Sequence, residues 1–413
     1  MVGSVTVPWW IVQQGGAVQL AQYGICMGLT AALSMPLFSP LGDRFSKNRV
    51  IAAALALDAL AAFLIAAVAS TATYHFWAVL LAGVIETMAL SMVGPAASSI
   101  TAELVPSQEL SAAMSSQKSA QSMGRLMGPA LGGCVVALGS IAAALWLHFA
   151  LLIFAMTMAL RIPTAAVSRH AGYSLRRWRD DLYAGLRTVA LVKLERNWTL
   201  INVLSWLFIG PAIGMLVPLK IHALGLSGGW LGACEAALSL GMLAGAMGGV
   251  AALQQTFSRY ALRVAGAVMQ GVALAAVGYL QNPWFLLLAF MVCGFFNSVA
   301  VLIGMTHRML ARPQAYRGRM SAVAMMATQI SASIGPAMAG MALTQFSLTA
   351  VYMAFGLLGA AFAGAMAFVP GFRALIALDH AQVENWYAKH YPQAFDAAPT
   401  DESLQRVRLK EQP

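Results

Sequence analysis

The stretch Gly124-Arg-Leu-Met-Gly128-Pro129-Ala-Leu-Gly132-Gly133 lies inside a long apolar segment of this 413-residue chain. Glycine and proline normally weaken a helix in water. In a membrane they are tolerated, because backbone polar groups there have no water to bind and must find partners within protein. Glycines at positions 124, 128 and 132 are four residues apart and form a ridge without side chains on one helix face. Such a ridge lets a second membrane helix approach closely.

Arg125 interrupts this ridge. A charge at membrane depth costs about 3 kcal/mol on insertion scales, so we expect the guanidinium to face protein or a water-filled cavity. Gln117 and Gln121 precede it at intervals of four residues, which predicts one polar face on this helix. Its partner is either a set of backbone carbonyls or a carboxylate at similar depth, for which Asp58 fits better than Glu86.

Composition places the chain among helical membrane proteins with many spans. Charged residues make up only 10% of the sequence, whereas a soluble domain has about 25%. The net charge of +10 is scattered over short loops, so we expect no nucleic-acid partner. The four cysteines fall singly in apolar segments without CxxC spacing, which indicates neither a metal site nor a disulfide framework. We expect no cofactor.

Hydropathy predicts one short apolar segment and eleven longer ones. The segment from Val2 to Gln14 would cover only about 20 Å of a hydrocarbon core about 30 Å thick. It resembles the second half of a first membrane helix whose beginning is missing, so we expect this helix to be short. The longer predicted spans are 17–41, 49–69, 75–101, 118–139, 141–162, 197–222, 229–253, 261–280, 283–305, 320–345 and 348–369.

The loops between these spans alternate in charge. The turns near 15, 70, 140, 225, 282 and 347 contain no lysine or arginine. The loops on the other side carry Arg44, Lys47, Arg49, Arg259, Arg263, Arg308, Arg312, Arg317 and Arg319. By the positive-inside rule these loops and the C-terminus are cytoplasmic. The sequence therefore predicts a multi-pass protein of the plasma membrane, which is the inner membrane if the cell is Gram-negative.

The two halves of the chain repeat each other. Pro106 to Gly133 aligns without gaps on Pro313 to Gly340, an offset of 207 residues. A parallel repeat of six spans predicts two bundles with a substrate path between them. The predicted parts are an N-terminal bundle (1–162), a basic cytoplasmic segment (163–196), a C-terminal bundle (197–369) and a cytoplasmic tail (370–413).

The pattern G-x-x-x-G-P-x-x-G-G resembles the fifth-helix signature of proton-coupled drug antiporters in the major facilitator superfamily. The loop from Ser39 to Arg49 resembles that family's G-x-L-x-D-R-x-G-R-R loop, with serine at 39 and 46 in place of glycine. In the family this loop latches the cytoplasmic face, although here its charges could also serve only to orient the spans. The resemblance implies gating roles for Asp43, Arg44, Lys47, Gly124, Arg125, Gly128, Pro129, Gly132 and Gly133.

The sequence from Ile100 to Pro106, with Glu109 and the glycine signature, resembles the branch that contains macrolide-efflux proteins and enterobactin-type siderophore exporters. The fourth span departs from the drug-antiporter pattern, because it lacks the motif arginine and carries Glu86. The resemblance implies an all-α membrane protein with the major facilitator fold, acting as a monomer and without enzymatic activity.

Three carboxylates lie well inside predicted spans: Asp58, Glu86 and Glu235. Burial favours the neutral form of a carboxyl group, so such a group can bind a proton at one face and release it at the other. We expect Glu86 to couple protons, with Glu235 and Asp58 as further candidates. The alternative is a neutral acid that only bonds a neighbouring helix. His148 and His222 are isolated, and we expect neither to relay protons.

Polar and amphipathic side chains inside the spans are predicted substrate contacts, unless they merely bridge helices. They are Gln121, Asn202, Trp206, Asn297 and Gln329. The sequence thus predicts a secondary active exporter of a small amphipathic molecule, a siderophore or a drug, by proton antiport with alternating access. An importer or uniporter and a lysolipid flippase are the alternatives on the same fold.

Small residues recur on three further spans. They are Gly24, Gly28 and Ala32; Gly241, Gly245 and Gly249; and Ser331, Gly335 and Ala339. In the resembled fold span five packs on span eight and span two on span eleven, and these pairs join the halves. We therefore expect Gly128 and Gly245 to lie at the interface between the two halves.

Overall fold

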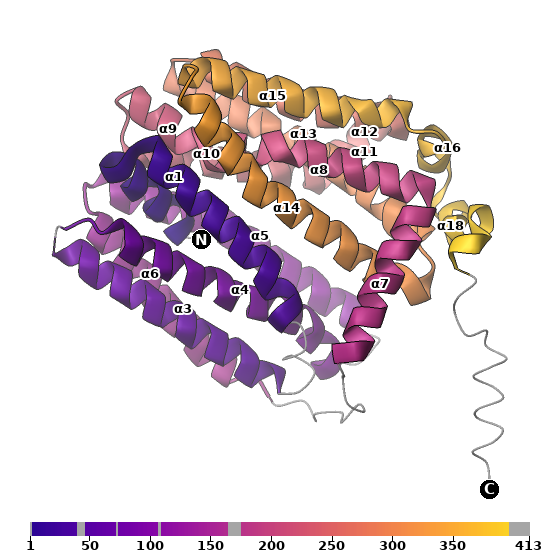
Figure 1. The fold of residues 1–413 in the computed structure, drawn as a ribbon, viewed down its shortest axis with the longest axis horizontal. Coiled ribbons are helices and arrows are strands. Elements are labelled where there is room, and N and C mark those ends of the chain that lie inside the picture. The colour runs from indigo at the N-terminus through magenta and orange to yellow at the C-terminus, as the bar shows by residue number, and fades with distance from the viewer. Residues whose placement is uncertain (1, 39–45, 72, 106–108, 164–174, 396–413) are drawn as a thin grey trace, which may run out of the picture.

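The computed structural model describes residues 2–38, 46–71, 73–105, 109–163 and 175–395. Within these ranges the regular structure is helical throughout (Figure 1). The first half contains α1 (Val2–Phe38), α3 (Lys47–Ser70), α4 (Phe76–Leu104), α5 (Leu110–Ala137) and α6 (Ile141–Leu160), and α7 (Leu175–Leu191) follows it. The second half contains α8 (Lys193–Gly214), α9 (Leu216–Ala223), α10 (Gly228–Ala244), α11 (Val250–Gln254), α12 (Arg259–Tyr279), α13 (Pro283–Ala311), α14 (Arg317–Leu343) and α15 (Leu348–Gly364).

Two glycines break helices that are otherwise continuous. Gly16, with φ 64° and ψ −161°, divides α1 into a helix over 2–15 and a helix over 17–38. The first of these is the short helix that the sequence predicts. Gly248, with φ 141°, lies in a π-helical turn over Gly245–Gly249 that separates α10 from α11. Only glycine adopts such φ values at little cost, so both breaks follow from the sequence.

The helices form two bundles, one above the other in Figure 1, with α7 running beside both. In the described part of the chain, nine helices are long and apolar enough to cross a membrane. α1 and α5 are not among the nine, and α5 carries Gln117, Gln121 and Arg125. The fold is therefore that of an all-helical membrane protein with two packed halves.

The halves meet where backbones come close enough to exclude side chains. A Cβ atom on Gly133 of α5 would lie 2.7 Å from the Cα of Gly232 in α10. On the other side, a Cβ on Gly28 of α1 would lie 2.6 Å from the Cα of Ser333 in α14. One turn earlier, a Cβ on Gly24 would lie 2.9 Å from Pro336. We call these two helix pairs, α5 with α10 and α1 with α14, the seam.

The prediction that Gly245 lies between the halves is wrong. Its Cβ would lie 2.7 Å from the Cβ of Ser298 in α13, within the second half. Gly335 likewise faces α8, with a Cβ position 2.6 Å from the carbonyl oxygen of Leu207. A small-residue ridge marks a close helix crossing but does not say which neighbour crosses there. On α10 and α14, the helix face that packs across the seam differs from the face that carries the predicted ridge of small residues.

Neighbouring glycines of the α5 signature also face different halves of the molecule. Gly132 faces its own half, since a Cβ there would lie 3.0 Å from the carbonyl oxygen of Val2. Gly133, the next residue, faces the other half across the seam. The placement of Gly128 between the halves stays a prediction.

The two halves are in contact along the seam at one end of the molecule. The contacts of the seam stop before they reach the opposite end. At the closed end Trp9 packs on His222, with ring centroids 6.0 Å apart, and a Cβ on Gly228 would lie 2.9 Å from Trp9 Nε1. Near the other end the Ser239 hydroxyl donates to the Arg125 carbonyl over 3.3 Å. Beyond that contact residues 120–125 are all exposed, and a Cβ on Gly124 would meet nothing within 4 Å.

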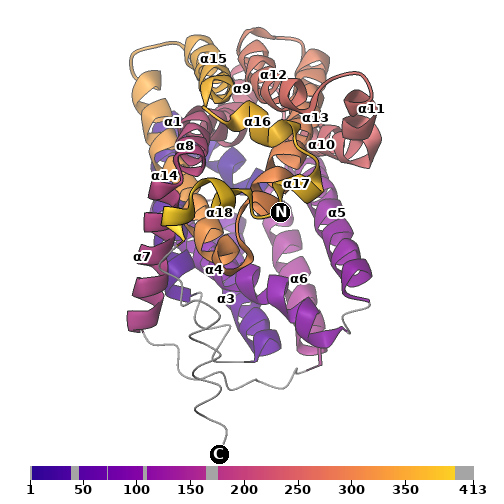
Figure 2. The same ribbon diagram turned by 90° about the vertical axis from the view of Figure 1, so that its right-hand side faces the viewer.

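Basic residues such as Arg317 and Arg319 lie at the end of the molecule beyond the Ser239–Arg125 contact, which we call the basic end. There α7 packs on α14, where a Cβ on Gly185 would lie 3.0 Å from the Arg319 carbonyl oxygen. The short helices α16 (Phe372–Ala377), α17 (His380–Val383) and α18 (Trp386–His390) lie across the same end of the second half (Figure 2). Phe372 packs edge-on against Trp198 of α8, with ring centroids 5.0 Å apart.

Two matched substitutions in α5 test the seam. Alanine normally stabilises a helix interior by about 1 kcal/mol relative to glycine, so Gly124→Ala should leave the thermal midpoint of the detergent-purified protein unchanged or raise it. Gly133→Ala should lower the midpoint, because its methyl group collides with the backbone of α10. Equal midpoints for the two variants would contradict close contact at Gly133.

Candidate functional site

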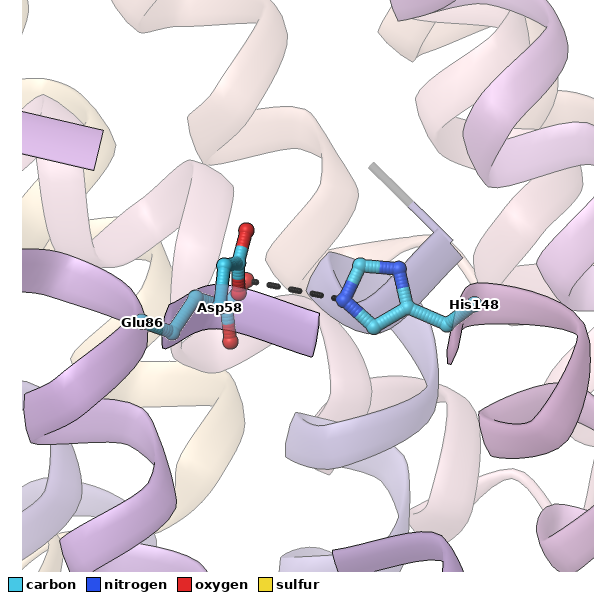
Figure 3. Close-up of side chains that lie close together, drawn as sticks. All are labelled: Asp58, Glu86 and His148. Carbon is cyan, nitrogen blue, oxygen red and sulfur yellow. Dashed lines mark ion pairs between the residues drawn. The ribbon is translucent and has the colours of Figure 1, made fainter. Parts of the chain in front are cut away.

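Three titratable side chains from three helices converge inside the first half (Figure 3). Asp58 comes from α3, Glu86 from α4 and His148 from α6, and one ligand atom of each lies within 4.8 Å of the others. His148 Nε2 is 4.0 Å from Glu86 Oε1. We call these residues the acidic cluster. The prediction that His148 is isolated is wrong, because packing of α3 on α6 brings it beside two carboxylates that are distant in sequence.

Small neighbours make room for the acidic cluster. A Cβ on Gly3 of α1 would lie 3.1 Å from His148 Nε2, so a larger residue here would require the ring to shift by a few tenths of an ångström. A cavity of about 10 Å³ adjoins Glu86 and His148 and is bounded by Tyr23. That is about the room that a single water molecule needs.

The cluster can hold a proton. Two carboxylates within 4.8 Å of each other would repel by at least about 3 kcal/mol at an effective dielectric constant of 20. A proton on one carboxyl group removes that repulsion. In the described structure, Asp58 Oδ1 and His148 Nε2 are buried and have no hydrogen-bond partner. A group that gains or loses a proton here changes the net charge of the cluster.

The same three residues are the set, among those described, that could surround a metal ion. Ligand atoms in a tetrahedral zinc site with bonds of about 2 Å lie about 3.3 Å apart. Since Glu86 and His148 are 4.0 Å apart, the cluster would have to contract around a metal. A proton requires no such contraction.

The second half contains a cavity of about 420 Å³ between α8, α12, α13 and α14. Small-molecule sites typically measure about 300–1,000 Å³. Four of the predicted substrate contacts line it, namely Asn202, Trp206, Asn297 and Gln329. The sequence analysis treated Arg263, Arg308 and Arg312 as charges of cytoplasmic loops, whereas the structure places them on this cavity. It did not single out Gln270, which also lines the cavity. We call this space the C-half cavity.

A further cavity of about 610 Å³ lies along the seam. Trp206, Thr328 and Gln329 line both this seam cavity and the C-half cavity. Tyr23 lines both the seam cavity and the small cavity beside Glu86. The three cavities therefore form a series from the acidic cluster to the interior of the second half, with Tyr23 and Trp206 at the two junctions.

The other predicted site residues lie elsewhere. Gln121 and Arg125 are exposed on α5 and line none of these three cavities, and no described carboxylate lies within 4.0 Å of Arg125. Asp58 therefore joins the acidic cluster instead of pairing with Arg125. Glu235 lies half-buried in α10 and also lines none of the three. Asp43 and Arg44 fall outside the described residues, and Lys47 begins α3.

A buried carboxylate at the basic end was missed by the sequence analysis, which placed it in the segment 163–196. Glu195 of α8 is fully buried and accepts hydrogen bonds from Arg308 over 2.7 Å and from Arg312 over 2.5 Å. Tyr387 donates to its second oxygen over 2.9 Å. Burial and the Glu195 carboxylate raise the pKa of the Tyr387 hydroxyl, so it remains a donor. The signal in the sequence was the pair of arginines at the end of a predicted span, with Arg308 in the last turn of α13 and Arg312 directly after the helix.

Two packed helical halves with a cavity along the seam between them are typical of secondary transporters. Residues 2–262 match the family model described as Major Facilitator Superfamily, and the chain belongs to that family. The fold is similar to that of the nucleoside transporter NupG, with a TM-score of 0.64 at 14% identity over 92% of this chain and 98% of that one. A mutant of the same transporter gives a TM-score of 0.67 at 14% identity, over 91% and 95% of the two chains. The sequence matches no curated protein.

Removing the Glu195 charge should destabilise the second half. In Glu195→Gln two guanidinium groups lose their shared carboxylate, and breaking a buried ion pair costs about 3–5 kcal/mol. The matched control is Asp379→Asn, which breaks the exposed pair with Arg259 and should cost at most about 1 kcal/mol. Thermal midpoints in detergent measure both, and an unchanged midpoint in Glu195→Gln would contradict a structural role for this network.

Proposed function

We propose that this transporter exports a small amphipathic molecule by proton antiport with alternating access. The observation that supports the proposal is the series of three cavities with shared lining residues, which extends from the acidic cluster to a cavity of substrate size. Tyr23 lies between the two, since it borders both the cavity beside Glu86 and the seam cavity. A change of charge at Glu86 therefore acts on a residue that also lines the substrate path.

The C-half cavity suits an amphipathic molecule. Trp206 offers an aromatic face, and the amides of Asn202, Asn297 and Gln329 offer hydrogen-bond donors and acceptors around it. Apolar walls with a few polar groups are typical of small-molecule sites. A siderophore or a drug is the substrate class that the sequence resemblance suggests.

The basic end is proposed to face the cytoplasm by the positive-inside rule. The separated ends of α5 and α10 then open the seam inward, so that substrate enters from the cytoplasm. The loop with Asp43, Arg44 and Lys47 and the glycine signature of α5 are proposed to gate this end. One elementary charge moved through 100 mV supplies about 2.3 kcal/mol, enough for a substrate gradient of tens-fold.

Glu86→Gln tests the coupling in inside-out vesicles with an acidic interior. The wild-type protein should accumulate its substrate, with catecholate siderophores and macrolides as the first compounds tried. The amide of Glu86→Gln cannot exchange a proton, so accumulation should fall at least tenfold while exchange of labelled for unlabelled substrate continues. Glu384→Gln, an exposed change in the tail, is the matched control and should accumulate substrate normally. Normal proton-driven accumulation by Glu86→Gln would remove Glu86 from the mechanism.

A second variant tests the link between the two sites. Tyr23→Phe keeps the ring that lines the seam cavity and removes only the hydroxyl. We expect substrate exchange to continue and the number of protons moved per substrate to fall, measured with a pH-sensitive dye inside the vesicles. An unchanged proton-to-substrate ratio would show that the hydroxyl takes no part in coupling.

A further inference from the structure

Arg263 of α12 lines the C-half cavity without a counter-charge. The residue is only 8% exposed, and its Nε is buried without a hydrogen-bond partner in the described structure. No described carboxylate forms an ion pair with it, whereas Arg308 and Arg312 in the same cavity share Glu195. Its guanidinium carbon lies 5.9 Å from the centre of the Trp198 ring. A cation–π contact of that length compensates only part of the cost of burying a guanidinium.

The surroundings hold Arg263 in the cavity. A Cβ on Gly304 of α13 would lie 2.5 Å from the Arg263 Nε, so only glycine leaves room for this side chain. Arg308 lies over the same Trp198 ring at 5.3 Å and adds a like charge. Trp198 in turn packs edge-on against Phe372 of the tail, with ring centroids 5.0 Å apart. The Arg263 side chain is therefore held among packed groups and stays buried.

A second unsatisfied donor lies on the same helix. Gln270 follows Arg263 by seven residues, two turns along one face of α12, and also lines the C-half cavity. It is 5% exposed, and its Nε2 is buried with no partner among the described residues. Buried donors are nearly always hydrogen-bonded. Arg312 Nε is a third buried donor without a partner among the described residues of this cavity, and three such donors indicate a ligand that supplies acceptors.

The net charge of the C-half cavity also favours a ligand that supplies acceptors. Three guanidinium groups line it, and Glu195 is the one described carboxylate bonded to any of them, which leaves a net charge of 3 − 1 = +2. The Arg317 side chain bonds the Arg312 carbonyl and adds further positive charge nearby. No acidic residue is among the described residues that line the C-half cavity.

We infer that the C-half cavity binds small organic anions, with a carboxylate or phosphate on Arg263 and its apolar body against Trp206. The inference rests on the proposed function only in taking this cavity as the substrate site. Arg263 and Gln270 are the specificity-determining residues. An amphipathic molecule without a negative charge would leave the Arg263 guanidinium unpaired and bind weakly.

Binding is measured by isothermal titration of the purified full-length protein in detergent. The probes are 2-naphthoate and its uncharged analogue 2-naphthamide, which share an aromatic body and differ in charge. The wild-type protein should bind the naphthoate at least tenfold more tightly. Arg263→Gln should lose at least tenfold in affinity for the naphthoate and bind the two probes equally. The control is Arg259→Gln, on the same helix but outside the cavity, which should keep the tenfold preference.

Stability separates a binding role from a structural one. Removal of a buried charge without a partner should not lower the thermal midpoint of Arg263→Gln, whereas loss of a structural residue would. If Arg263→Gln fails to fold, Gly304→Ala keeps the charge but displaces Nε, and it should still reduce naphthoate affinity several-fold. Titration with 2-naphthyl phosphate ranks phosphate against carboxylate, and either order supports an anion site.

Several outcomes would overturn the inference. They are equal or absent binding of both naphthyl probes by the wild-type protein, and an undiminished naphthoate preference in a folded Arg263→Gln or in the Gly304→Ala fallback. Binding in detergent requires no proton gradient. Failure here would therefore leave proton coupling by Glu86 standing, and failure of the Glu86 test would leave the anion site standing.

Discussion

The structure depends on backbone-to-backbone contact along the seam. At Gly133 with Gly232 and at Gly28 with Ser333 no side chain separates the two halves. In a membrane, lipid tails compete with apolar side chains for the same surface, so close packing of small residues is what holds helices together. A smooth contact of this kind lets the halves rock without freeing interlocked side chains. The same seam contains the larger cavity, so motion of the halves and access to the cavity are linked.

The two halves contain different kinds of ionisable group in their interiors. The first half brings together two carboxylates and a histidine, which we propose carry a proton. The second half buries guanidinium groups, two of which share the Glu195 carboxylate and one of which has no described carboxylate partner. Both kinds of group are costly inside a membrane unless they are paired or functional. The seam cavity lies between them, bordered by Tyr23 from one half and Trp206 from the other.

Much of the fold could be predicted from the sequence, because apolar length and loop charge follow directly from the thickness and polarity of a bilayer. Four of five predicted substrate contacts line the C-half cavity, since polar side chains inside a span have few other places to lie. Contacts between helices that are distant in sequence were harder to predict. His148 gave no local sign that α3 and α4 would place carboxylates beside it, and the ridge at Gly245 did not reveal that its neighbour is α13. Glu195 was missed because its position among basic residues suggested a solvated segment.

The central claim is that a proton on the acidic cluster decides how far the halves separate at the basic end. Spin labels at Ala120 of α5 and Met247 of the π-helical turn, both exposed, would report that separation by pulsed electron resonance after replacement of the four native cysteines. We expect the distance distribution of the otherwise wild-type protein to shift between acidic and alkaline buffer. In Glu86→Gln it should stay the same in both. A distribution in the wild-type protein that does not change with pH would contradict the claim.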